Sequence, residues 1–418
     1  MNKLTVQIDF GKGPQKVGEL YLSESLGRYV FAYDKTFIGG GLEISPETMP
    51  LGNDTYIAKK NSDLYDLHGV FADSLPDEWG KKVQNAEFEK IGHYEVTAID
   101  RLAFVGQFAI GALKYHPDDT FETGKDAVTL ANLRKTTQSI IEGTVENVSR
   151  ELLRCGGSAG GARPKFLVDL DVRTMSDIRY TQGRIDGNYV PVVLKVPTSN
   201  GEHWNRIEYA YSKMAKKCDI SIPHTYLLKG RTPGPAYFAI ERFDTLPDGT
   251  RLHVHSLAGM LGQSFREMHI DYRQMLRLTG DLTRNHGNVV DVYRRMVFNY
   301  LGNNRDDHAK NFSFVMNPDG EWAVSPAYDI SYSPGENSLH AMAANGKRRN
   351  LTLGDFREIA QDFEIKSWKK IILKTNSVLK GWEKRAVKSG IPKKLTTAIQ
   401  ARIRENINRI EKDLKTQY

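Results

Sequence analysis

The segment from residue 289 to residue 329 constrains the fold more than any other part of the chain. Apolar residues recur at helical spacing over Val289–Gly302. The polar run Asp306-Asp307-His308-Ala309-Lys310-Asn311 follows, and Asn317-Pro318-Asp319-Gly320 then predicts the turn of a β-hairpin. Asp329 comes after the hairpin, among apolar residues. A helix that leads through a polar loop into a hairpin predicts an α+β fold for this region.

The polar residues of this segment have a spacing that suits phosphoryl transfer. Transfer from ATP needs a carboxylate that orients or deprotonates the attacking hydroxyl, and oxygen ligands for the Mg²⁺ that bridges the phosphates. Protein kinases place an Asp and an Asn five positions apart and a second Asp further on. We therefore predict Asp306 as the catalytic base and Asn311 and Asp329 as the metal ligands. Lys310 or His308 could contact a phosphate or hold the loop.

Two other interpretations of the same residues stay open. Asp and Asn are common where helices end and hairpins begin, so these residues could simply shape the backbone. Asp306, Asp307 and His308 could instead form a metallohydrolase site, but the nearby sequence offers no further His at metal-ligand spacing. The first alternative describes a structural loop and the second a different enzyme.

Upstream residues predict a nucleotide-binding sheet. Lys195 lies in the apolar strand Tyr189–Val196, where a lone cation needs a partner or an anionic ligand, and an ATP phosphate would serve. Glu208, on a helix predicted over Trp204–Lys217, could pair with it as in kinases. A lysine that reaches back to the surface is the simpler alternative. The segment Glu241-Arg242-Phe243 closes a later strand, where backbone groups could contact adenine.

A glycine-rich loop precedes this sheet. Residues 156–165 include Gly160, Gly161 and Ala162, whose small size lets backbone N–H groups approach a phosphate, and Lys165 adds a charge. The loop does not match the Walker pattern, and an ordinary flexible connection explains its glycines equally well. Ser158, inside the loop, could be phosphorylated.

The whole chain divides into three predicted segments. Residues 1–120 form a β-rich module, residues 121–250 a nucleotide-binding lobe, and residues 251–418 a helical lobe with the polar loop. In the first segment we predict strands over Val17–Ser23, Tyr29–Tyr33 and Phe104–Tyr115. A helix is predicted over Leu75–Phe88, with an N-cap from Asp73-Ser74.

Composition limits the functional classes. The 418 residues are 40% hydrophobic and include two cysteines, so we expect neither a disulfide framework nor a Cys-rich zinc site. No signal peptide or membrane-spanning run is apparent, and we expect a cytoplasmic protein. From Lys366 to the end, 15 Lys and Arg face 4 Asp and Glu. This basic tail could meet phosphates or an acidic partner, or form a solvated helix face.

Taken in order, five motifs resemble the HipA family of bacterial toxin kinases. They are Ser-Ala-Gly-Gly-Ala-Arg-Pro-Lys (158–165), Val-Leu-Lys (193–195), Glu-Arg-Phe-Asp (241–244), Asp-Asp-His-Ala-Lys-Asn-Phe-Ser (306–313) and Tyr-Asp-Ile-Ser (328–331). The N-terminal segments 17–21 and 70–77 also resemble that family. One departure is Arg163-Pro164, where the family often has Gln-Glu.

The resemblance implies a two-lobed, protein-kinase-like fold and a serine/threonine kinase that uses ATP and Mg²⁺. Such a toxin typically phosphorylates an aminoacyl-tRNA synthetase, arrests growth, and pairs with a DNA-binding antitoxin through which it reaches DNA. Asp306 carries over as catalytic, Asn311 and Asp329 as metal ligands, and Ser158 as the autophosphorylated serine. The predicted nucleotide-contacting residues are Gly160, Gly161, Ala162, Lys165, Lys195, Glu241, Arg242, Phe243, His308, Lys310 and Tyr328.

Two other functional classes remain. The chain could be a co-repressor that joins an antitoxin on operator DNA, with weak or lost kinase activity. It could also phosphorylate a small molecule such as a sugar or an antibiotic. Substituting Asp306 by Asn would separate the first from a kinase, because only phosphate transfer should depend on that carboxylate.

Overall fold

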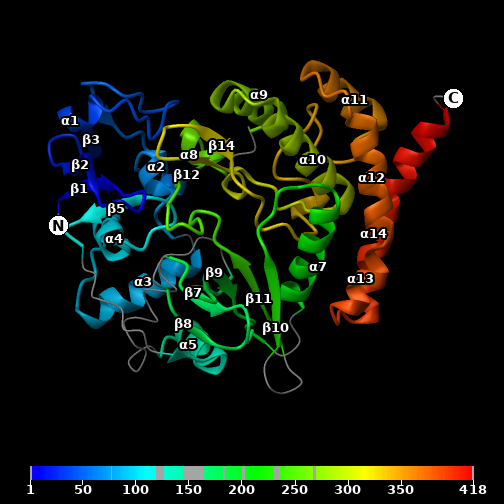
Figure 1. Ribbon diagram of the computed structural model, residues 1–418, viewed down its shortest axis with the longest axis horizontal. Coiled ribbons are helices and arrows are strands. Elements are labelled where there is room, and N and C mark those ends of the chain that lie inside the picture. The colour runs from blue at the N-terminus through cyan, green and yellow to red at the C-terminus, as the bar shows by residue number, and fades with distance from the viewer. Residues whose placement is uncertain are drawn as a thin grey trace. The chain divides into compact units, whose positions relative to one another are not determined.

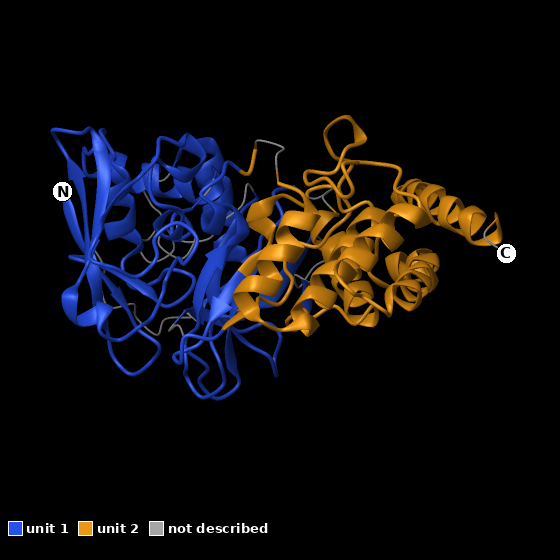
Figure 2. Ribbon diagram, turned by 90° about the horizontal axis from the view of Figure 1, so that it is seen from above, with its two compact units in different colours: residues 1–202, 226–264, 314–321 blue, residues 203–225, 265–313, 322–418 orange. Residues whose placement is uncertain are grey.

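The computed structural model describes residues 2–76, 78–118, 127–144, 163–181, 184–199, 203–229, 235–266 and 270–416. The chain forms two compact units, coloured separately in Figure 2. The first comprises residues 1–202, 226–264 and 314–321, and the second comprises residues 203–225, 265–313 and 322–418. Each unit thus combines segments that are distant in sequence.

The first unit begins with an antiparallel sheet in the order β4-β3-β2-β1-β5 (Figure 1). In β1 the apolar residues Leu4, Val6 and Ile8 alternate with more exposed ones and are fully buried, as expected for a sheet with one face on the core. The strands are β1 (Lys3–Ile8), β2 (Gln15–Ser23), β3 (Arg28–Tyr33), β4 (Thr55–Ile57) and β5 (Leu113–His116).

The helices that accompany this sheet differ in part from the sequence prediction. The helix expected from Leu75 begins at Glu78, and Asp73 does not cap it, because its carboxylate accepts hydrogen bonds from His255 and Ser256 instead. A helix also covers Phe104, where we expected a strand. The helices are α1 (Lys35–Ile38), η1 (Ser62–Leu64), α2 (Gly69–Ala72), α3 (Glu78–Lys90) and α4 (Ala98–Val105).

A second sheet in the same unit has the order β10-β11-β9-β7-β8-β6. On one face, alternate residues such as Phe166, Leu194 and Ala239 pack into a hydrophobic core with Trp79 of α3 and Leu133 of α5. The elements are β6 (Ala127–Val128), α5 (Leu130–Glu142), β7 (Lys165–Asp171), β8 (Ile178–Tyr180), β9 (Tyr189–Lys195), β10 (Thr225–Lys229) and β11 (Ala236–Glu241).

A short third sheet has the order β12-β13-β14 and includes the predicted hairpin. Its strands are β12 (His253–Ser256), β13 (Ser313–Met316) and β14 (Trp322–Val324), and α8 (Leu257–Leu261) follows β12 directly. The division into units passes through this hairpin.

The second unit is mainly helical. Helix α10 is its central element, since Val292, Tyr293 and Met296 are fully buried and the helix packs against α9, α12 and α14. The elements are α7 (Trp204–Lys217), α9 (Tyr272–Thr283), α10 (His286–Gly302), η2 (Ala309–Asn311), η3 (Glu336–Ser338), α11 (Leu353–Asp362), α12 (Trp368–Lys380), α13 (Trp382–Lys388) and α14 (Lys393–Thr416).

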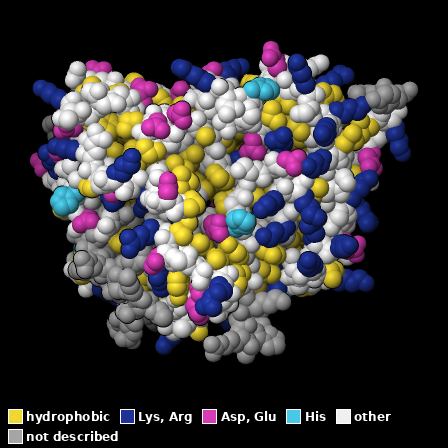
Figure 3. Space-filling view, viewed as in Figure 1, with side chains coloured by type: hydrophobic (Ala, Val, Ile, Leu, Met, Phe, Trp, Pro, Cys, Tyr) yellow, Lys and Arg dark blue, Asp and Glu magenta, His cyan; other side chains and the backbone are white. Residues whose placement is uncertain are grey.

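The C-terminal helices are amphipathic and basic. Ile371, Ile372 and Leu379 of α12 are buried, while Lys and Arg side chains lie over the surface of these helices (Figure 3). Lys374 and Lys380 form ion pairs with Asp219 and Glu411. Among the described residues, no helix is both long and apolar enough to cross a membrane.

Candidate active site

The polar loop begins where helix α10 ends. Asn303 adopts a left-handed conformation, with φ of 55°, and its N–H donates to the carbonyl of Asn299, which closes the last helical turn. Asn tolerates this conformation better than most residues. Three residues later the loop presents Asp306, whose side chain is 67% exposed, whereas the next residue, Asp307, is buried. The two adjacent carboxylates therefore have different environments.

Asp307 is held by three donors. It accepts from the hydroxyl of Tyr272 at 2.9 Å, from Nδ1 of His340 at 3.0 Å and from the N–H of Ala341 at 2.9 Å. Burial, with the Asp307 charge, raises the pKa of Tyr272 well above its usual value, so its hydroxyl stays protonated and donates. Asn299 in turn donates to that hydroxyl at 2.9 Å. This network fixes the loop one peptide away from Asp306.

Asn311 and His308 lie against Asp306. The side-chain amide of Asn311 donates to the backbone carbonyl of Asp306 at 2.7 Å, which folds the loop back on itself. Nε2 of His308 is 3.6 Å from the Asp306 carboxylate, and its ring lies 5.4 Å from that of Phe265. The structure thus brings the predicted catalytic residue together with one of the predicted metal ligands.

The segment that carries Asp329 is tied to the same loop. The hydroxyl of Tyr328 donates to the carbonyl of Lys310 at 2.8 Å and lies 2.5 Å from the hydroxyl of Ser313. Asp329 itself has a φ of 52°, a left-handed conformation that is unusual for a residue with a side chain. The ammonium group of Lys310 lies 4.7 Å from the centre of the Phe265 ring. Asp329 therefore belongs to the same part of the second unit as Asp306 and Asn311.

Asn311 and Asp329 suit Mg²⁺, which is held in part by substrate and water, better than they suit a metal ion whose ligands all come from the protein. No group of three or more His, Cys, Asp or Glu that could hold a metal occurs among the residues that the structure describes. Mg²⁺ typically uses one or two carboxylates, waters and substrate phosphates. Asn311 and Asp329 fit that requirement. The metallohydrolase interpretation is weakened, because Asp307 is already committed to Tyr272, His340 and Ala341.

The first unit contains a second group of predicted residues. In the paired strands β7 and β9, Lys165 lies directly opposite Lys195, and Phe238 of β11 lies opposite Lys195 on its other side. Residues directly opposite on antiparallel strands project from the same face, so both lysines and the aromatic ring share one face of the sheet. Both lysines are buried, with exposures of 4% and 6%. The two predicted phosphate-contacting lysines are therefore neighbours on this face.

The segment Glu241-Arg242-Phe243 has a structural role through its second residue. Arg242 is buried and makes a two-pronged ion pair with Asp244, at 2.9 and 2.6 Å. Burial by itself raises the pKa of Asp244, but the Arg242 guanidinium outweighs it and lowers that pKa below the usual value. Glu241 accepts a hydrogen bond from Tyr226. An adenine contact from this segment would then come from backbone groups or from Phe243.

Some predicted residues cannot be placed. Gly160, Gly161, Ala162 and Ser158 lie outside the described residues. Glu208 is buried on α7 in the second unit.

Sequence reasoning missed the residues that support the site. Tyr272 and His340, which hold Asp307, are distant from it in sequence, and no local pattern marks them. Trp79 donates from its indole to the carbonyl of Lys165 at 3.1 Å. The adjacent carboxylates Asp306 and Asp307 are the local feature that could have suggested a search for residues that hold one of them.

Family models match most of the chain. Residues 157–384 match the HipA-like C-terminal domain, and residues 12–116 match the HipA N-terminal domain. The chain belongs to the HipA family. This result confirms the resemblance predicted from the five sequence motifs.

Individual relatives agree with this assignment. A chain from the solved complex of the Shewanella oneidensis MR-1 toxin–antitoxin system HipA, HipB and its operator DNA has a TM-score of 0.70, with 16% sequence identity and 99% coverage of both chains. That likeness confirms the predicted α+β fold. "Putative kinase Y4dM" of Sinorhizobium fredii is 28% identical over 48% of this chain and 53% of its own length. A "Putative kinase" of Haemophilus influenzae is 25% identical over 43% and 54%. The chain spans about half the length of these two curated relatives.

Proposed function

We propose that the protein is an ATP- and Mg²⁺-dependent serine/threonine protein kinase. The observation that carries this proposal is the contrast between two adjacent carboxylates: Asp307 is buried and hydrogen-bonded, whereas Asp306 is exposed. The network around Asp307 fixes the loop, and the same loop exposes the carboxylate of Asp306 with Asn311 folded against its backbone. A fixed loop that presents an accessible carboxylate beside a metal-ligating amide is what transfer to a hydroxyl requires.

In the proposed reaction the Asp306 carboxylate accepts the proton of a serine or threonine hydroxyl. The hydroxyl oxygen forms a bond to the γ-phosphorus of ATP, the bond between that phosphorus and the β–γ bridging oxygen breaks, and ADP leaves. Asn311 and Asp329 would hold the Mg²⁺, which neutralises charge on the phosphates. Lys165 and Lys195 would contact phosphate oxygens, and Glu241, Arg242 and Phe243 the adenine side.

Biological role and partners are also proposals. Membership of the HipA family and the names of the two curated relatives support a kinase toxin of a type II toxin–antitoxin system. The related solved chain was crystallised with HipB and operator DNA, which supports a DNA-binding antitoxin as partner here. We propose an aminoacyl-tRNA synthetase as the substrate, with inhibition of translation as the outcome, and Ser158 as an autophosphorylation site.

The test is incubation of the full chain and a cell extract with labelled ATP and Mg²⁺, followed by mass spectrometry. We expect label on an extract protein, no transfer when EDTA removes the metal, and a rate at least about 100-fold lower in Asp306→Asn. Asp319→Asn, which changes an exposed carboxylate in the hairpin turn, is the matched control and should retain full activity. Equal transfer by wild type and Asp306→Asn would refute the assigned base.

A second candidate is a co-repressor that binds the antitoxin on operator DNA. The solved HipA, HipB and DNA complex favours testing it, because its HipA chain shares the fold. ATP binding without any phosphate transfer, combined with normal assembly on DNA, would support this alternative. Loss of DNA assembly in Asp306→Asn would count against separate kinase and binding roles. Faster labelling of a metabolite than of any protein would identify a small-molecule kinase.

A further inference from the structure

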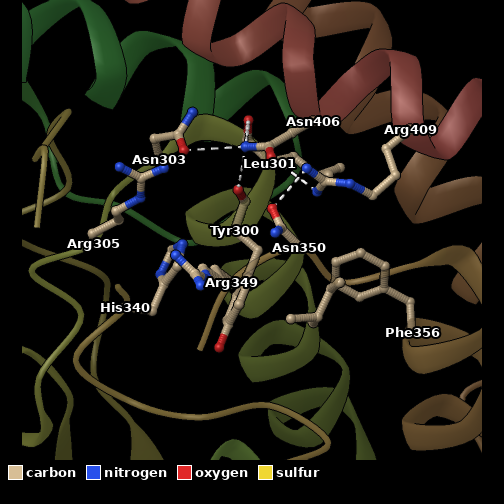
Figure 4. A pocket seen from close by; sticks show the side chains of 11 residues that line it. Tyr300, Leu301, Asn303, Arg305, His340, Arg349, Asn350, Phe356, Asn406 and Arg409 are labelled. Carbon is tan, nitrogen blue, oxygen red and sulfur yellow. Dashed lines mark hydrogen bonds between the residues drawn. The ribbon is translucent and has the colours of Figure 1, made fainter. Parts of the chain in front are cut away.

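The second unit contains a pocket beside the end of helix α10 that the proposed reaction does not use. Its volume is about 300 Å³, which includes space open to solvent. Its walls come from the last turn of α10, the residues that lead to Asp306, the segment 340–351 and the middle of helix α14 (Figure 4). These parts of the chain all belong to the same unit.

The pocket lining is cationic. It includes three arginines, one histidine and three asparagines, and it contains no Asp or Glu. In Figure 4 the three arginines reach the pocket from different sides. The carboxylates of Glu405 and Asp307 act electrostatically on one of these arginines from outside the lining. The polar lining residues are Asn303, Arg305, His340, Arg349, Asn350, Asn406 and Arg409.

Two donors in this lining are buried without an acceptor. Nδ2 of Asn303 and Nε of Arg305 have no hydrogen-bond partner in the described part of the chain. A buried donor that is left unsatisfied is unfavourable. Burial also lowers the pKa of the Arg305 guanidinium from its ordinary value, as expected for a cation held partly away from water. Both donors belong to residues that line the pocket.

The orientation of Asn303 follows from its neighbours. Nδ2 of Asn406 donates to the carbonyl of Tyr300 at 2.9 Å, which fixes the orientation of that amide. The same Nδ2 lies 3.1 Å from Oδ1 of Asn303, so Asn303 must accept there and its own Nδ2 must remain a donor. The carbonyl of Tyr300 thus sets the orientation of both amides, so the unsatisfied Nδ2 of Asn303 does not result from an arbitrary amide flip.

The asparagine oxygens are occupied in a similar way by Arg409. Its guanidinium donates to Oδ1 of Asn350 at 2.8 Å and to Oδ1 of Asn406 at 3.2 Å. These bonds hold the guanidinium in place, so little side-chain entropy is lost when it binds a ligand. Arg349 is exposed at the rim and can move to meet a ligand.

We propose that this pocket binds a phosphate-type oxyanion. A phosphoryl dianion suits three guanidinium groups better than a carboxylate ligand does, because a tetrahedral phosphoryl group offers acceptors to several donors at once. The ligand is either a free phosphate compound or a phosphorylated side chain, and both present the same phosphoryl group. The binding site is independent of whether the protein is a kinase.

An anion here would act on residues that adjoin the candidate active site. Arg305 immediately precedes Asp306 in the chain, and His340 donates to Asp307. An occupied pocket would therefore hold the loop more rigidly from its N-terminal side.

The test is calorimetric titration of the full chain with inorganic phosphate and, separately, with O-phosphoserine, with serine as the blank. We compare the wild type with the double variant Arg349→Gln, Arg409→Gln. The control Arg404→Gln changes an exposed arginine of the same helix outside the pocket. Lys195→Gln reports phosphate bound at the sheet of the first unit. We expect the double variant to bind phosphate at least about tenfold more weakly, because it loses charge-assisted hydrogen bonds to the phosphoryl oxygens.

The control Arg404→Gln should bind phosphate as the wild type does, and Lys195→Gln should keep the binding that the double variant loses. Tighter binding of O-phosphoserine than of inorganic phosphate would identify a phosphorylated side chain as the source, and the reverse would identify a free phosphate compound. Equal affinity in wild type and double variant, or loss only in Lys195→Gln, would overturn the proposal. If the double variant does not fold, Arg349→Gln alone decides, since the exposed Arg349 should tolerate replacement and still weaken binding severalfold.

Discussion

Each unit contains a largely buried aspartate paired with a histidine, and the two pairs differ in what lies beside them. In the first unit, Asp73 accepts from Nδ1 of His255 at 2.6 Å and from the backbone and hydroxyl of Ser256. In the second unit, Asp307 accepts from Nδ1 of His340 and from two further donors. Both carboxylates are satisfied by hydrogen bonds, as buried charges must be.

Accessibility separates the two regions. Oγ of Ser45 lies 3.0 Å from Nε2 of His255, which gives the first pair the hydroxyl–imidazole–carboxylate order of a serine hydrolase. Ser45 and His255 are both fully buried, so no substrate reaches that hydroxyl. Asp307, in contrast, adjoins the exposed Asp306. The same pair of residue types therefore lies in the buried interior of one unit and, in the other, beside the exposed Asp306 that we propose as the catalytic base.

Among these variants, Asp307→Asn should cause the largest decrease in the rate of phosphoryl transfer. If it does not, the proposed difference between the two Asp–His pairs is wrong. An amide oxygen cannot replace a carboxylate that accepts from three donors, so Asp306 should lose its fixed position. We expect phosphoryl transfer to fall about 10–100-fold, as for other losses of orientation. Initial rates with labelled ATP, normalised to folded protein by circular dichroism, provide the measurement. Unchanged rates would show that the network is purely structural.

Asp73→Asn should affect stability instead. Three donors converge on Asp73, so the amide leaves at least one of them unsatisfied and costs about 2–3 kcal/mol of unfolding free energy. The urea midpoint of the full chain should fall, while the transfer rate per folded molecule stays within about twofold of the wild type. A large rate loss at unchanged stability would remove the distinction between the two regions.

Tyr272→Phe sharpens the comparison by removing one donor from Asp307. The phenyl ring keeps the packing of this buried side chain but leaves Asp307 with two donors and Asn299 without the hydroxyl acceptor. We expect a loss of about 1 kcal/mol and a rate decrease of a few-fold. Val289→Ala, in the same helical unit, serves as a stability-matched control that should lower the melting temperature without changing the rate.

The pH dependence of stability gives the smallest expected effect. Burial raises the pKa of Asp73, but the hydrogen bonds and charge of His255 and the bonds from Ser256 outweigh it, so the net pKa is lowered. A lowered pKa in the folded state contributes stability above the unfolded value of about 3.9, and this contribution is lost as the pH falls below it. The difference in urea midpoint between wild type and Asp73→Asn should therefore be constant from pH 7 to pH 5 and shrink below about pH 4. A constant difference down to pH 3 would contradict the assignment.

Local pattern predicted much of the fold. The helix expected over Trp204–Lys217 and the strand expected over Tyr189–Val196 match α7 and β9 within a residue, because amphipathic spacing is a local property. The prediction failed at the start of the strand expected over Phe104–Tyr115, because Phe104 and Val105 end α4 and only Leu113–His116 form a strand. Every residue of α4 is buried, and a short apolar run of this kind can be mistaken for a strand.

The candidate site was predicted less completely than the fold. The sequence order predicted Asp306, Asn311 and Asp329 as site residues, since their spacing lies within one segment. The donors to Asp307 come from residues more than 30 positions away, and only packing brings them together. The sequence did not predict the arginine pocket either, because Arg305, Arg349 and Arg409 come from three separate segments that only packing brings together.

The left-handed backbone at Asp329 changes which substitution is conservative. Glutamate keeps the charge, but longer side chains adopt a φ near 52° less readily than Asp and Asn do. Asparagine removes the charge and keeps the backbone. For making an inactive protein that still folds and binds its partners, Asp329→Asn is therefore the gentler choice, and Asp329→Glu is the one that would confuse loss of chemistry with distortion of the chain.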